Sequence, residues 1–255
     1  MSKITTLDLR PERFRYSAFD GFYNSHDLTA CAWFNLADFD ASLAWLHGWP
    51  GELESRNAQV LRLIQFQPGS ISFILSVDRP RDLDVAQSLL QRLIETPSNG
   101  TLQNQRISYL IYLKGSAGEQ PNAYLNLARL VSQTDRVVLF PKLVTELPPT
   151  AIYSDFYNST RNAPAVLTSS RESSAFPFIP FSPLMVHRDD ATWCDERFDF
   201  LGSPSVPWAE CLWQFWVTKH GGVQTIVSKH PWKTAQNVNQ TMVTLAVSRA
   251  FEKRS

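Results

Sequence analysis

The sequence predicts an α/β fold, a mostly parallel sheet flanked by helices, and two observations support this prediction. Short runs of strand-forming residues alternate with segments whose apolar residues recur every three or four positions. Strands that alternate with helices pair in parallel through right-handed crossovers, which builds a doubly wound sheet. The length of 255 residues, with 44% hydrophobic and 19% charged residues, suits one globular domain with a sizeable core.

The alternation is clearest in the first half of the chain. Strands are expected at 28–34, 71–78, 107–113 and 137–140, and helices at 36–47, 82–95 and 122–131. Residues 1–27 are expected to form an irregular lead-in, and 52–70 fit either a strand or a helix. The apolar run 137–140 (Val-Val-Leu-Phe) suits a strand covered on both faces. The residues after it therefore lie at the carboxyl end of a central parallel strand, where open α/β sheets bind their ligands.

The second half carries weaker signals. A helix is expected at 150–157, and strands at 164–168, 184–187 and 223–227. A further helix is expected to begin near Pro207, with Ser205 as its N-cap, and to end at the glycines 221–222. Residues 170–183 form a long loop rich in Ser, Phe and Pro, which either covers a site or is an ordered surface loop pinned by its Phe side chains.

Charge and motifs argue against several functions. Lys and Arg number 24, as do Asp and Glu, so no excess charge points to nucleic acid or to a membrane surface. No run approaches the ~20 apolar residues of a membrane-spanning helix. No G-x-G-x-x-G or G-x-x-x-x-G-K loop follows a strand, which argues against a dinucleotide-dependent oxidoreductase and against a P-loop NTPase.

Evidence on the cellular compartment points in two directions. The polar N-terminus is neither a signal peptide nor an anchor, which favours the cytoplasm or a sequence that lacks its true start. Three N-x-S/T sequons, at Asn99, Asn158 and Asn239, fit a lumenal protein.

The three cysteines include no C-x-x-C pair, so a structural zinc site is not expected. Cys194 and Cys211 either form a disulfide or stay buried as free thiols, and we expect free thiols.

One stretch, residues 122–149, resembles a region of glycosyltransferase family 49, the LARGE-type transferases. That region reads N-x-x-R-N-x-A-R, then a strand, then D-x-D. Asn122, Asn126, Ala128 and Arg129 match the helix, and the strand matches as well. The D-x-D motif, which holds a metal ion in the family, does not match, because this chain has Phe-Pro-Lys-Leu at 140–143.

A second stretch resembles the acceptor-side segment of the same family. It consists of Cys-Asp-Glu-Arg-Phe at 194–198, followed by Gly202 and a helix at 208–217. Together the two stretches extend the resemblance over about residues 28–232. The two motifs are specific in combination and only moderately specific alone.

The resemblance implies a glycosyltransferase-A-like fold and a glycosyltransferase activity. Residues 28–255 would form one domain, with a nucleotide-sugar half at 28–149 and an acceptor half at 150–255. The expected reaction transfers a sugar, with inversion, from a nucleotide-sugar, a UDP-sugar in the first place, to a glycan or glycoprotein acceptor. Members of the family usually work in the Golgi lumen. The alternative is a catalytically inactive pseudo-glycosyltransferase that binds a glycan or a protein partner.

The resemblance also implies roles for individual residues. It places a catalytic base at Asp195 or Glu196, where a carboxylate would take the proton of the acceptor hydroxyl. The other interpretation is structural, with Asp195 capping a turn and Glu196 paired with Arg197.

On the helix before the central strand, the resemblance implies that Asn122, Asn126 and Arg129 hold the nucleotide-sugar. The arginine would lie against its diphosphate. Alternatively, these residues form a solvated helix face on which Asn122 is the N-cap.

Asp78, Lys142 and His230 complete the candidates. Asp78 ends a strand at the ligand edge and either contacts the nucleotide or caps the next helix. Lys142 stands in the run that replaces the D-x-D motif and would supply part of the missing metal ion's charge. His230 has no companion carboxylates, so it is weak evidence for a metal site. A divalent metal such as Mn²⁺ is therefore a doubtful cofactor.

Overall fold

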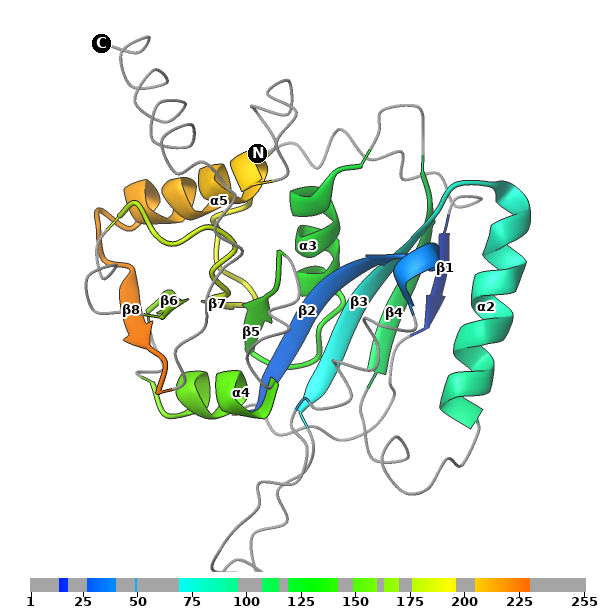
Figure 1. Cartoon of the computed structure of the whole chain (residues 1–255), viewed down its shortest axis with the longest axis horizontal. Coiled ribbons are helices and arrows are strands. Elements are labelled where there is room, and N and C mark those ends of the chain that lie inside the picture. Colours follow the sequence, from blue (N-terminus) through cyan, green and yellow to red (C-terminus); the bar gives the residue numbers. More distant parts are fainter. Residues whose placement is uncertain are drawn as a thin grey trace, which may run out of the picture.

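An eight-stranded mixed sheet forms the centre of the part of the chain that the structure describes (Figure 1). The structure is a computed structural model that describes residues 14–17, 27–39, 49, 69–95, 107–114, 119–141, 149–159, 163–169, 176–195 and 205–229. The strands are β1 (Phe14–Ser17), β2 (Leu28–Asn35), β3 (Ser70–Val77), β4 (Ile107–Leu113), β5 (Arg136–Leu139), β6 (Ala165–Thr168), β7 (Leu184–His187) and β8 (Gln224–Val227). The helices are the 3-10 turn η2 (Leu36–Asp38), α2 (Pro80–Glu95), α3 (Pro121–Leu130), α4 (Pro149–Tyr157) and α5 (Ser205–Thr218). The strand order across the sheet is β1-β4-β3-β2-β5-β7-β6-β8.

Four adjacent strands, β4, β3, β2 and β5, run parallel, which confirms the predicted class. The chain builds outward from β2 to β3 and β4, and then returns to place β5 on the other side of β2. The boundary between β2 and β5 is therefore the point where the direction of winding reverses. Open α/β sheets bind ligands in the crevice at the carboxyl ends of the strands that flank such a point.

Two strands, β1 and β7, run antiparallel to their neighbours. β1 pairs with β4, so the prediction that residues 14–17 belong to an irregular lead-in is wrong. The strand Phe-Arg-Tyr-Ser alternates aromatic and polar residues, but this pattern was missed in the polar and charged N-terminal stretch. β7 lies between β5 and β6, and β8 pairs in parallel with β6. The second half of the chain thus extends the same sheet.

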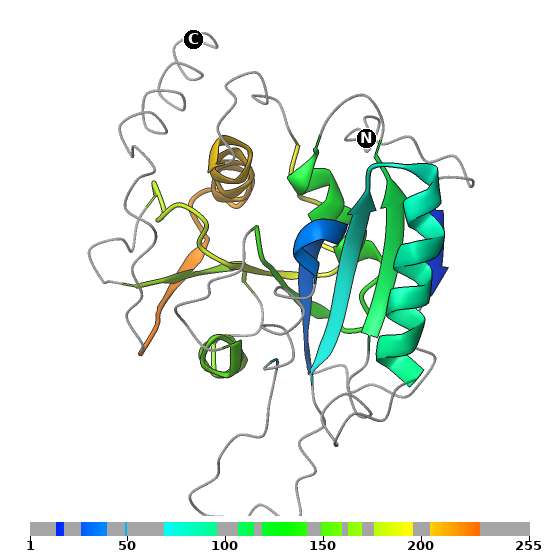
Figure 2. The ribbon, with the colours of Figure 1, turned by 45° about the vertical axis from the view of Figure 1, so that its right-hand side comes forward.

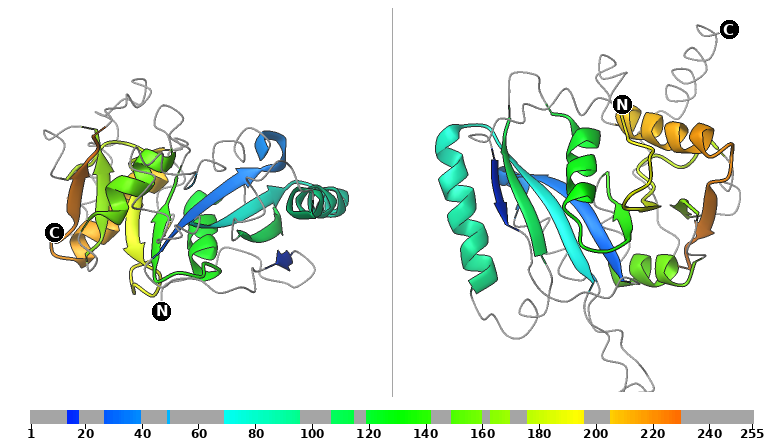
Figure 3. Two further views of the ribbon diagram at one scale, coloured as in Figure 1. Left: turned by 90° about the horizontal axis from the view of Figure 1, so that it is seen from below. Right: turned by 180° about the vertical axis from the view of Figure 1, so that it is seen from behind.

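Helices cover both faces of the sheet (Figure 2 and Figure 3). On one face, α2 and α4 pack over a core that contains Phe73 of β3. On the other face, α3 and α5 pack over a core that contains Val137 of β5. All eight residues of β3 are buried, which explains why Ser is the only polar type in this strand. This layering is the doubly wound arrangement that the alternation of elements predicts.

The helices α2, α3 and α4 agree with the predicted ranges to within two residues, whereas Ser205, predicted as the N-cap of the last helix, is the first residue of α5. α5 ends in a turn at which Gly221 has a φ of +79°, a left-handed conformation that favours glycine. Of the helix expected at 36–47, residues 36–38 form the 3-10 helix η2 and Phe39 is α-helical, and 40–47 lie outside the described residues. The ambiguous stretch 52–68 and the loop residues 170–175 also lie outside them. None of the helices that the structure describes is both long and apolar enough to cross a membrane.

Candidate functional site

Polar side chains gather where three parallel strands end. Asn35 ends β2, Asp78 follows β3 and Lys114 follows β4. The pairing register sets Asn35 beside Ser76 and Ser76 beside Tyr112, so the three strands end at the same level. We call this level the carboxyl edge, and it lies toward the top of Figure 1.

Hydrogen bonds and ion pairs join these side chains into one cluster. The Asn35 side-chain amide donates to Glu119 Oε1 (2.8 Å), and its oxygen accepts a bond from Ser76 Oγ (2.7 Å). The Lys114 ammonium lies 2.9 Å from Glu119 Oε1 and 3.1 Å from Asp78 Oδ1. We name these five residues the edge network. It connects the ends of three strands with Glu119, the residue before the N-cap of α3.

The edge network carries one cation and two carboxylates. Burial is the largest influence on Lys114 and lowers its pKa, but the bonds to Glu119 and Asp78 together outweigh burial and hold the pKa above its ordinary value. Lys114 is therefore charged at neutral pH. Its side chain is only 13% exposed, whereas those of Glu119 and Asp78 are 42% and 77% exposed. Carboxylate oxygens thus face solvent above a covered ammonium group.

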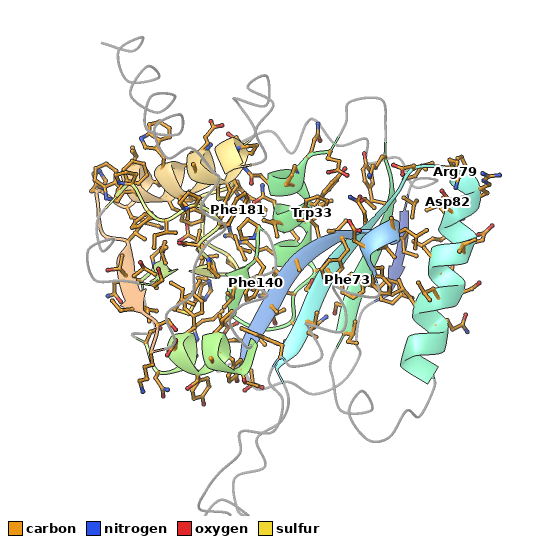
Figure 4. All side chains as sticks on the ribbon, in the orientation of Figure 1. Trp33, Phe73, Arg79, Asp82, Phe140 and Phe181 are labelled. Atoms are coloured by element: carbon orange, nitrogen blue, oxygen red, sulfur yellow. A yellow bond between two sulfur atoms is a disulfide. The ribbon has the colours of Figure 1, made fainter. Side chains whose placement is uncertain are left out.

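Aromatic side chains lie beneath the edge network, on the face that α3 covers. Trp33 and Tyr112 each pack against Tyr124 with ring centroids 5.7 Å apart, and Figure 4 shows Trp33 beside α3. Two buried polar atoms, Trp33 Nε1 and Gln120 Oε1, have no hydrogen-bond partner in the described part of the chain. Because buried polar atoms are almost always bonded, we expect a water or a ligand atom next to them.

The described end of β5, where family 49 carries its D-x-D motif, places Phe140 and Pro141 where the motif would begin. Phe140 is buried, and its ring packs against Trp49 with centroids 5.5 Å apart. Its amide donates to Cys31 O and continues the pairing with β2. Within the described ranges, no group of three His, Cys, Asp or Glu side chains could hold a metal ion. Lys142, the expected substitute for the metal charge, lies outside the described residues.

Arg129, expected at the diphosphate, is buried and binds the protein's own backbone. The residue is 0% exposed. Its guanidinium donates to the carbonyl oxygens of Arg188, Thr192 and Asp190, the first two at 2.6 and 2.7 Å. It also lies 4.8 Å from the ring centroid of Trp193. This geometry disagrees with both interpretations of Arg129 made from the sequence, a diphosphate ligand and a solvated side chain, because its donors and its position are taken up by the fold.

Asn126 and Asn122 have the same structural role. Asn126 exchanges two bonds with the backbone of Cys194, and Asn122 donates to the carbonyl oxygen of Pro207. The first turn of α3 thus binds α5, its middle binds residue 194, and its last turn binds residues 188–192. The segment 188–195 therefore runs along α3 in the opposite direction and leads toward the carboxyl edge.

Asp195 stands at the end of this segment that is nearest the carboxyl edge. Its amide donates to Gln214 Oε1 (3.1 Å), and Gln214 Nε2 donates to its carbonyl oxygen (3.3 Å). The side-chain amide of Gln214, on α5, thus makes the same pair of bonds with the backbone of Asp195 that a neighbouring strand would make. Glu196 and His230 lie outside the described residues.

A disulfide between Cys194 and Cys211 adds a covalent link between this segment and α5, with Cα atoms 4.6 Å apart. The expectation of free thiols at these two positions is wrong. Cys31 is the buried free cysteine of the described chain.

Asp190 anchors the same segment through charge, and this predicts a pH dependence. Burial is the largest influence and raises the pKa of Asp190, but a bond from Lys219 (2.7 Å) and one from the Thr192 amide (2.9 Å) outweigh it and lower the pKa. A lowered pKa in the folded state gives stability that is present above the unfolded pKa and is lost as the pH falls through the folded pKa. We expect Asp190→Asn to be less stable than the wild type to urea at pH 7, and the difference to shrink from about pH 4 downward and to vanish once the pH is below the lowered pKa of Asp190. A difference that is independent of pH would contradict this assignment.

A cavity of about 220 Å³ lies at the opposite edge of the sheet, lined among others by Arg136, Met185 and His187. Arg136 begins β5, so this cavity is far from the carboxyl ends of the parallel strands. It includes no residue of the edge network, and we assign it no function.

The sequence identified Asp78 at the carboxyl edge but not Asn35, Lys114 or Glu119. The signal that would have found them is the position directly after each predicted strand, since these positions meet at one edge. Comparisons of the chain with protein-family models and with curated proteins find no match.

Proposed function

We propose that this protein binds a nucleotide-sugar at the carboxyl edge and transfers the sugar to a glycan or glycoprotein acceptor. The observation that carries the proposal is the edge network, beside the point where the direction of winding reverses. Its exposed carboxylates accept hydrogen bonds from ligand hydroxyls, in the way that an acidic residue binds ribose in dinucleotide sites.

The strand order supports a glycosyltransferase-A-like sheet over a dinucleotide-binding sheet. Without β1, and numbered along the chain, the order is 3-2-1-4-6-5-7, with the sixth strand antiparallel. The first four strands follow the dinucleotide-binding order 3-2-1-4-5-6, but the antiparallel strand beside the fourth does not. Such an inserted antiparallel strand is typical of the glycosyltransferase-A-like fold that the resemblance to family 49 implies.

In the proposed reaction, Asp195 acts as the base. It takes the proton of the acceptor hydroxyl while the acceptor oxygen bonds to the anomeric carbon of the sugar. The bond from that carbon to the phosphate oxygen breaks, and the nucleoside diphosphate leaves. The pairing of the Asp195 backbone with Gln214 keeps the base in place. Lys142, three residues after the end of β5 in the sequence, is the proposed partner of the diphosphate charge.

A thermal-shift screen against UDP-, GDP- and CMP-sugars, each with and without Mn²⁺, tests donor binding. A donor at 100 times its dissociation constant stabilises the folded state by about 2.7 kcal/mol, which raises the Tm by a few degrees. We expect one donor to raise the Tm, and Asp78→Asn/Glu119→Gln to abolish this rise. Asp82→Asn is the matched control, because Asp82 is a carboxylate at the start of α2 that pairs with Arg79 outside the edge network (Figure 4).

A second candidate function is a pseudo-glycosyltransferase that binds a glycan or a partner protein. The observation that favours it is the burial of Phe140 against Trp49, at the position where the family's metal-binding motif begins. If no donor shifts the Tm of a folded sample, this function replaces the first. Binding to immobilised glycans would then be the next measurement.

A further inference from the structure

The Lys114 ammonium occupies the space between the two carboxylates of the edge network. It lies 3.1 Å from Asp78 Oδ1 and 2.9 Å from Glu119 Oε1. The Lys114 amide donates to Val77 O (2.8 Å), which fixes the chain beside Asp78. The ammonium is covered, and each of its two partners has one oxygen on it. A divalent cation would bind the same two oxygens, at distances of about 2.0–2.6 Å.

We propose that Lys114 is the resident cation of the carboxyl edge: it takes the place that a divalent metal ion would need between Asp78 and Glu119, so a ligand binds here without a metal. The proposal rests on the proposed function only for the identity of that ligand. It concerns the ends of β3 and β4, and it is separate from the end of β5, where the D-x-D motif of the resemblance would stand. The Lys114 ammonium is fixed by two carboxylates, and its backbone is fixed by one hydrogen bond. Its positive charge is therefore present at any concentration of metal ions.

The same arrangement decides which ligand groups bind. One oxygen of each carboxylate is held by Lys114, and the network keeps an excess of one negative charge. Phosphate groups are repelled by this excess, whereas hydroxyl groups donate to the exposed oxygens. The edge network is therefore a site for a diol, such as a ribose or a sugar ring. The diphosphate of the same ligand would lie away from it, toward the end of β5.

Removing the ammonium should convert the edge into a metal site. We expect Lys114→Met to bind Mn²⁺ at least roughly tenfold more tightly than the wild type in isothermal titration calorimetry, because Asp78, Glu119 and Asn35 then offer oxygen ligands with no competing cation. The triple change Asp78→Asn/Lys114→Met/Glu119→Gln should lose this binding again. Lys219→Met is the matched control, because Lys219 pairs with a single carboxylate, that of Asp190, and should gain no Mn²⁺ affinity.

The outcomes separate this proposal from the proposed function. A folded Lys114→Met protein that binds Mn²⁺ no better than the wild type would overturn the proposal, as would wild-type Mn²⁺ binding that Asp78→Asn abolishes. In a second arm, UDP is titrated into the wild type with EDTA and with Mn²⁺. Equal UDP affinity in both solutions supports a site that needs no metal, and strict dependence on Mn²⁺ overturns it. No UDP binding in either solution counts against the proposed function, and the Mn²⁺ titrations of the variants still decide the role of Lys114.

Discussion

Replacing Arg129 with methionine is expected to lower the free energy of unfolding by about 3–5 kcal/mol. The guanidinium is the shared donor to three carbonyl oxygens, those of Arg188, Asp190 and Thr192. A buried carbonyl left without a donor costs about 1–3 kcal/mol, and part of that cost is recovered where water reaches the group. Methionine keeps the aliphatic stem of the side chain but not the guanidinium, so the effect combines the lost hydrogen bonds with the volume that the guanidinium fills.

Lysine at the same position should be nearly as harmful. An ammonium group is a point donor and cannot reproduce the planar fork with which Arg129 reaches three oxygens. Burial lowers the pKa of Arg129, and the nearby Asp190 opposes this, so the guanidinium stays charged in the fold. We therefore expect Arg129→Lys to be destabilised as well, in contrast to a surface Arg-to-Lys change.

Urea unfolding followed by circular dichroism measures these effects. Arg79→Met is the matched control, because Arg79 is an exposed arginine that pairs with Asp82 at the surface, and its loss should cause no measurable change. If Arg129→Met unfolded at the same urea concentration as this control, the three hydrogen bonds would not be contributing to stability. Since Arg129 holds the segment that leads to Asp195, a folded variant should also show faster amide exchange over 188–195.

The fate of Arg129 shows where reasoning from the sequence stops. The leucines and alanines of α3 alone account for its apolar spacing. The sequence around Arg129 would therefore look the same whether its side chain were buried or exposed to solvent. The partners of Arg129 lie 59 to 63 residues further along the chain. No local pattern reports a contact of that range, so a resemblance to a ligand-binding helix was the only guide, and it pointed to the wrong partner.

The parallel strands were predictable for a physical reason. Every residue of β3 and β5 is buried, and all of them are apolar or small except Arg136, at the start of β5. β7, by contrast, was predicted as a strand at the correct residues, but not as an antiparallel one. The direction of β7 depends on the path by which the chain enters the sheet between β5 and β6. The composition of a strand does not indicate this path. Three residues of the edge network, Asn35, Lys114 and Glu119, were missed for a related reason. They are polar residues at the ends of elements, and only the alignment of the three strand ends shows that they form a cluster.

The disulfide between Cys194 and Cys211 leads to the second large effect that we expect. The bond closes a loop with a sequence separation of 17, and a loop of about that length restricts the unfolded chain enough to stabilise the fold by about 3 kcal/mol. The double change Cys194→Ala/Cys211→Ala should lower the free energy of unfolding by about this amount. Dithiothreitol should lower the stability of the wild type and leave that of the double variant unchanged.

A thiol count makes the test of the disulfide independent of stability. The chain has three cysteines, and Cys31 is free and buried. Protein purified without reductant and then denatured should therefore react with a thiol reagent at one position, and at three after reduction. Three reactive thiols without reduction would mean that the pair is not formed, and the expectation of free thiols would stand after all. One reactive thiol together with an unchanged stability in dithiothreitol would mean that the bonds of Asn126 and Gln214 to residues 194 and 195 hold the segment on α3 and α5 without the covalent link.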